Sequence, residues 1–87
     1  MDILRTRGSV SLPGRGEIEV TLDLYDPPLT DDVLPRGWTA TIAEGPQLTV
    51  GERGLLYLDA QRAAIANPFV VVTSTAGISR IRGVTDV

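Results

Sequence analysis

The 87-residue sequence contains no cysteine, no histidine and no lysine, and all eight of its basic residues are arginine. The missing residue types supply most of the nucleophiles and acid–base groups that enzymes use near neutral pH. They also supply the thiolate and imidazole ligands of most transition-metal sites. We therefore expect no enzymatic activity and no cofactor. The lack of cysteine also excludes disulfides, which fits a reducing compartment.

Charge and hydropathy argue against two classes of partner. Eight arginines stand against 11 carboxylates, a formal net charge of −3, whereas nucleic-acid binders usually carry a basic surplus. The chain has no apolar run of about 18 residues that could span a membrane as a helix. Residues 1–8 lack the apolar segment of a secretory signal. We therefore expect no nucleic-acid or membrane partner. We expect the protein to be located in the cytoplasm or in a virion, or outside the cell if the chain is a fragment of a longer one.

What the sequence does contain is a pattern typical of β-structure. In residues 17–25, Ile18, Val20, Leu22 and Leu24 alternate with polar side chains. Strict period two over nine residues predicts a half-buried antiparallel strand. Residues 9–12 alternate as well, and the Pro- and Gly-rich residues 13–16 between the two segments predict a hairpin turn.

Further short strands are predicted along the rest of the chain. We expect them at residues 38–42, 48–50, 55–58, 69–74 and 78–84, with Trp38 in the core and 69–74 covered on both faces. Residues 59–66 are rich in alanine and predict a short helix or crossover, the alternative being one helix over 55–66.

Taken together, the spacing of strands and turns predicts an all-β fold with a single domain over residues 1–87. About seven short strands favour an immunoglobulin-like antiparallel β-sandwich, with a small β-barrel as the alternative. A chain of this length buries a thin core. Contacts with copies of itself or with a larger assembly are therefore the expected source of additional burial.

Three segments resemble a known family. They are residues 35–42, with proline, glycine and tryptophan, residues 48–53, with a leucine-threonine strand and a glycine-glutamate turn, and residues 69–74. Together they are similar to bacterial and archaeal immunoglobulin-like modules of the CARDB and NPCBM-associated type. The chain departs from that pattern at Val50, where proline is usual, and in the alanine-rich residues 59–66. The resemblance implies a spacer or adhesion module in a longer surface protein.

Carboxylates gather around the proline-rich connection that follows the second strand. Asp23, Asp26, Asp31 and Asp32 are hard oxygen ligands of the kind that bind calcium, although their spacing matches no EF-hand loop. The two interpretations are a cation site and a set of solvated carboxylates, two of them beside a helical turn begun by Thr30.

Arginine pairs and two tyrosines are the candidate contacts for a protein partner. Arg5 with Arg7, and Arg80 with Arg82, share a strand face within each pair because their spacing is two. If the first and last strands were neighbours, the two pairs would form one stripe of four arginines suited to binding carboxylates. The alternative is that these outward charges protect the edges of the sheet from pairing with another strand. Tyr25 and Tyr57 are the aromatic residues that we expect at an interface.

These observations favour a non-enzymatic module that acts through protein–protein contacts. Small β-rich accessory proteins of tailed-phage virions, which decorate capsids or join connectors, are the setting that fits its size. The alternatives are the extracellular immunoglobulin-like spacer and a calcium- or carbohydrate-binding β-domain.

Overall fold

The computed structural model describes residues 3–25, 34, 37–59 and 65–84, and the regular structure in these ranges is entirely β-strand. The six strands are β1 (Ile3–Leu12), β2 (Gly16–Tyr25), β3 (Thr39–Glu44), β4 (Arg53–Leu58), β5 (Asn67–Thr75) and β6 (Ile78–Gly83). Within the described ranges, no helix is both long and apolar enough to cross a membrane.

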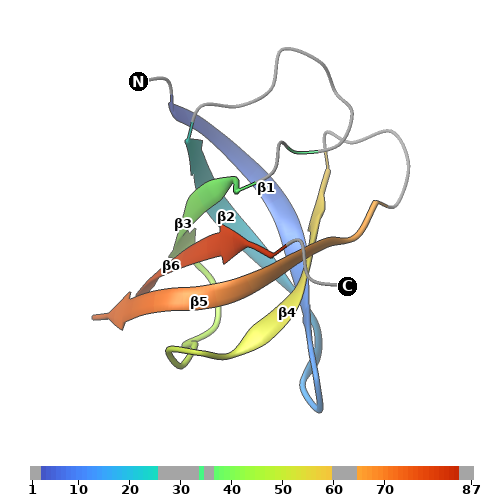
Figure 1. The fold of residues 1–87 in the computed structure, drawn as a ribbon, viewed down its shortest axis with the longest axis vertical. Coiled ribbons are helices and arrows are strands. Elements are labelled where there is room, and N and C mark those ends of the chain that lie inside the picture. Colours follow the sequence, from blue (N-terminus) through green and yellow to red (C-terminus); the bar gives the residue numbers. More distant parts are fainter. Residues whose placement is uncertain (1–2, 26–33, 35–36, 60–64, 85–87) are drawn as a thin grey trace.

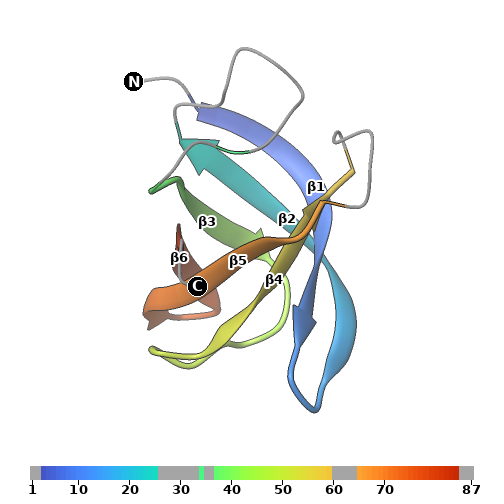
Figure 2. The same ribbon diagram turned by 45° about the vertical axis from the view of Figure 1, so that its right-hand side comes forward.

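The strands form one closed antiparallel barrel (Figures 1 and 2). Their order around it is β1-β2-β3-β6-β5-β4, and β4 pairs with β1 to complete the circle. Every strand therefore has a partner on both sides. Closure shortens the free sheet edges to which another strand could pair, although the first residues of β1 pair only with β2.

The period-two pattern of the sequence decides which side chains fill the barrel. On β2, Val20, Leu22 and Leu24 point inward and are 4%, 0% and 2% exposed, while their polar neighbours point outward. All six strands contribute to the same core. Its buried apolar residues on the strands are Val10, Leu12, Val20, Leu22, Leu24, Ala40, Ile42, Leu56, Leu58, Phe69, Val71 and Ile81.

Trp38 closes one part of this core immediately before β3. Its indole is 8% exposed, which confirms the prediction of a core tryptophan. Gly83 of β6 donates its backbone N–H to the carbonyl of Trp38 at 2.7 Å, and the absence of a side chain at Gly83 leaves room for the indole.

The predicted immunoglobulin-like sandwich of seven strands is wrong, and the alternative of a small β-barrel is confirmed. Alternation predicts that one face of each strand is buried, and both architectures satisfy that condition. The pairing of β1 with β4 distinguishes them. Gly8 lies in that pairing, where a Cβ atom would collide with the carbonyl oxygen of Tyr57 and lie 3.3 Å from the Cα of Leu58.

Local predictions were confirmed in part. The hairpin of β1 and β2 is present, with β1 starting at Ile3 rather than at residue 9. Residues 48–50 are not a strand, because Glu52 folds back to Thr49 through a backbone hydrogen bond of 2.9 Å and a side-chain hydrogen bond of 3.1 Å.

The prediction that residues 69–74 are covered on both faces is wrong, since Val72 is 44% exposed on the outside of the barrel. Residues 55–58 belong to β4, which contradicts one helix over 55–66. The expected short helix over 59–66 lies mostly outside the described residues, and residues 59, 65 and 66 are not helical.

Candidate functional site

Three neighbouring strands of the barrel carry arginine as their only charged residue type. β6, β5 and β4 contain Arg80, Arg82 and Arg53, and no carboxylate. The strand register places Arg82 opposite Val70, and Val70 opposite Arg53, so these side chains follow one row across the sheet. We call the outer face of β4, β5 and β6 the arginine wall.

Arg80 is positioned by an aromatic ring of a strand further round the barrel. Its guanidinium lies over the ring of Tyr25 at 5.6 Å from the centroid, within the range of a cation–π interaction. The hydroxyl of Tyr25 shares a hydrogen bond of 2.7 Å with Oγ1 of Thr41, and Thr41 is the cross-strand partner of Arg80. Two residues predicted to contact a partner, Tyr25 and Arg80, are thus in contact with each other.

Exposed apolar side chains lie beside these arginines. Val72 on β5 is 44% exposed and Ile78 on β6 is 51% exposed. Val50 is also exposed, and the turn that contains it is joined to β5 by hydrogen bonds of Val71 with Gly51 and Glu52. Arginine is enriched at protein–protein interfaces, and the aliphatic side chains beside it would lose contact with water if this face were covered.

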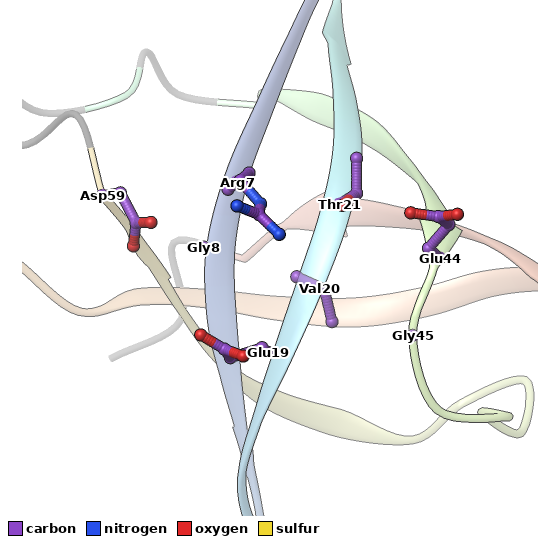
Figure 3. A pocket seen from close by; sticks show the side chains of 8 residues that line it. All are labelled: Arg7, Gly8, Glu19, Val20, Thr21, Glu44, Gly45 and Asp59. Carbon is purple, nitrogen blue, oxygen red and sulfur yellow. The ribbon is translucent and has the colours of Figure 1, made fainter.

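A polar recess of about 250 Å³ lies on the opposite wall of the barrel. Glu19 on β2, Glu44 at the end of β3 and Asp59 just after β4 place their carboxylates around Arg7 of β1 (Figure 3). Asp59 lies beyond β1 on one side of Arg7, and Glu44 lies beyond β2 on the other. Three carboxylates against one arginine make this carboxylate recess acidic.

Arg5 and Asp23 form an ion pair with two hydrogen bonds. Nε of Arg5 donates to Oδ1 of Asp23 at 2.8 Å, and Nη2 donates to Oδ2 at 3.0 Å. These hydrogen bonds, with a smaller contribution from charge attraction, hold the pKa of Asp23 below its usual value of 3.8. The same interactions raise the pKa of Arg5. Both carboxylate oxygens of Asp23 therefore accept hydrogen bonds from the guanidinium of Arg5, and the two opposite charges are in direct contact.

The four arginines predicted as one stripe are separated in the barrel. β1 carries Arg5 and Arg7, and β6 carries Arg80 and Arg82 on its outer face as expected. However, β2 and β3 lie between β1 and β6, so the prediction that first and last strands are neighbours is wrong. Nor do the arginines of β6 protect an edge, because β6 pairs with β3 and β5.

The remaining predicted residues are placed as follows. Tyr57 is half-buried on β4 opposite Ser9, apart from the contact between Tyr25 and Arg80. Asp26, Asp31 and Asp32 lie outside the described residues, so the predicted cation site is described only at Asp23. In the described ranges no three acidic groups lie close enough together to hold a metal ion.

A second recess of about 440 Å³ is mostly apolar and lies where β1, β4 and β5 meet. Leu12 and Phe69 line it, with Gly54 between them. A Cβ atom at Gly54 would lie 2.9 Å from atoms of both side chains. The glycine therefore keeps β4 close to its neighbours at this end of the barrel.

Sequence reasoning did not single out Arg53, Glu19, Glu44 or Asp59. Strand order and register align Arg53 with Arg82 on the arginine wall. They also bring Glu19, Glu44 and Asp59, from different parts of the chain, around the recess. Their spacing along the chain holds no signal that could have identified them.

Comparison of the chain with protein-family models, with curated proteins and with solved structures gave no match.

Proposed function

We propose that this chain is a non-enzymatic structural module that acts through protein–protein contacts of its outer surface. Within that role, we propose that it is a small repeated component of a larger assembly such as a virion, as a capsid-decorating or connector protein. The observation that carries the proposal is the separation of charge around the barrel. β6, β5 and β4 have only arginine among their charged residues, whereas β2 has only Glu17, Glu19 and Asp23.

The build of the barrel supports contacts through side chains. Its centre is filled by the aliphatic and aromatic core, and small barrels of this kind have little internal space for a ligand. Both recesses lie on the outside. Charges and exposed aliphatic residues on a rigid barrel are suited to specific contacts between proteins.

The proposal is tested by the oligomeric state of the purified chain. Sedimentation velocity over a concentration series, at low and at high sodium chloride, should show association that weakens as salt rises, because exposed charges are screened. A monomer that is unaffected by concentration and salt would count against an assembly built from copies of this chain.

The virion setting needs a separate test. Genes for capsid or tail proteins next to the gene for this chain would support it, and detection of the protein by mass spectrometry in purified particles would establish it. Particles that contain the neighbouring gene products but lack this chain would contradict it.

A further inference from the structure

The arginine wall and the carboxylate recess lie on opposite sides of the barrel. In the order β1-β2-β3-β6-β5-β4, β1 is opposite β6 and β2 is opposite β5. Arg80 and Arg82 therefore project from one side, while the recess beside Glu19 opens on the other. The guanidinium of Arg80 reaches Tyr25 at the end of β2, but Tyr25 does not line the recess. Within one copy, neither Arg80 nor Arg82 forms an ion pair with Glu19, Glu44 or Asp59.

Two properties make the arginine wall available to a partner. Arg80 and Arg82 are exposed, and in the part of the chain that the structure describes neither forms an ion pair with a carboxylate. The wall also carries the exposed Val72 and Ile78, which could be buried in a contact. Arginine recognises carboxylates through its planar, bidentate guanidinium.

The carboxylate recess has the complementary properties. Glu19, Glu44 and Asp59 are exposed and surround a hollow of about 250 Å³. Arg7 lies among these carboxylates, so the recess carries three negative charges and one positive charge. The net charge of the chain is −3, which disfavours a polyanion such as nucleic acid as the partner of the wall.

We propose that the arginine wall docks into the carboxylate recess of a second copy of this chain. This inference rests on the proposed function and names its contact. The two surfaces differ, so the contact is head-to-tail, and each copy keeps one free wall and one free recess. Such contacts continue into a ring if the rotation closes and into a filament if it does not.

The test uses two variants that each lose one of the two surfaces. Arg80→Gln with Arg82→Gln removes two of the three arginines of the wall and leaves the recess unchanged. Glu19→Gln with Glu44→Gln removes two of the three carboxylates of the recess and leaves the wall unchanged. Both variants keep a net negative charge, since they change −3 to −5 and to −1. Attraction between oppositely charged proteins therefore cannot explain association in a mixture of the two.

Sedimentation velocity should give a distinct result for each sample. Each variant alone should self-associate at least about tenfold more weakly than the wild-type protein. An equal mixture should form a heterodimer of near wild-type affinity that grows no further, because its free wall and its free recess have each lost two of their three charged residues of one sign. Glu17→Gln, on the same face of β2 but outside the recess, and Arg15→Gln, in the β1–β2 turn, should associate like the wild type.

The outcomes separate this inference from the proposed function. If the wild type associates and the variants associate equally well, another surface is used, so the inference fails while the proposed function stands. A mixture that forms no heterodimer also overturns the inference. A wild-type protein that stays monomeric overturns the inference and counts against an assembly built from copies of this chain, while contacts with other proteins are tested separately. Binding of duplex DNA through Arg80 and Arg82 would also overturn the inference.

Discussion

Gly83 and Trp38 offer a sharp test of how the core of this barrel is packed. Gly83 is buried on β6, and its N–H donates to the carbonyl of Trp38 at 2.7 Å. A Cβ atom at Gly83 would collide with Nε1 and Cδ1 of the indole and would lie 2.8 Å from Cε2. The backbone hydrogen bond fixes both partners, so a methyl group can be accommodated only if the indole or β6 moves.

We expect Gly83→Ala to destabilise the protein by about 1–3 kcal/mol. Overpacking of a core costs about 1–3 kcal/mol. If the indole turns outward and exposes about 50 Å² more apolar area, that adds about 1 kcal/mol at 25 cal/mol per Å². Alanine in a strand would otherwise be favoured over glycine by about 0.5–1 kcal/mol, so the collision decides the sign. For a domain of this size, about 1–3 kcal/mol corresponds to a fall in Tm of roughly 5–25 °C.

Urea denaturation followed by fluorescence measures both effects, because Trp38 is the only tryptophan. The midpoint should fall, and the emission of the folded variant should shift to longer wavelength if the indole becomes hydrated. Trp38→Val removes the three indole atoms that collide. In that background, followed by circular dichroism, Gly83→Ala should cost almost nothing. An equal cost in both backgrounds would refute the proposed collision.

Three further outcomes are expected from the same structure. Leu22→Ala should cost about 3 kcal/mol by leaving a cavity at a position that is 0% exposed; a change below about 1 kcal/mol in urea denaturation would contradict a filled core. Because Arg5 lowers the folded-state pKa of Asp23, the pair stabilises the fold above the unfolded pKa of about 4, and this stabilisation is lost as pH falls through the folded-state pKa. Asp23→Asn should therefore have a lower free energy of unfolding than the wild-type protein at neutral pH, and the difference between the two should shrink in acid. A difference in unfolding free energy that is independent of pH would argue against the pair. Gly8→Ala should lower the Tm, because its methyl would meet the backbone carbonyl of Tyr57, which cannot move without opening the β1–β4 pairing; an unchanged Tm would show that the pairing tolerates a side chain.

The accuracy of the strand predictions followed the strength of the alternation. The predicted strand at residues 17–25 matches β2 to within one residue, because every inward position is aliphatic and every outward position is polar or aromatic. β1 was predicted too short. Its first residues are exposed or charged, and Gly8 stands at an inward position, so burial left no apolar pattern there, although pairing with β2 continues to Ile3.

The errors came from features that depend on distant residues. An apolar run such as residues 69–74 indicates a strand but does not say how many of its faces are covered, and β5 has one face on the outside. Leu48 is buried without belonging to a strand. The strand predicted at residues 48–50 was wrong because a buried apolar side chain in a turn gives the same local sequence signal as a short strand. The arginines of β6 were correctly placed on an outer face, but their neighbours were not.

The sequence by itself determined that this protein is built of β-strands, which side chains face the core, and that its charged residues lie outside, because burial of alternate aliphatic residues is encoded locally. Only the tertiary structure decided that the sheet closes, through the pairing of β1 with β4. Closure then determined which charges are neighbours. It separates Arg5 and Arg7 from Arg80 and Arg82, and brings Glu19, Glu44 and Asp59 around one recess. The turn between β1 and β2 could be predicted locally, but the pairing of β1 with β4 and of β3 with β6 depends on contacts between segments far apart in the chain.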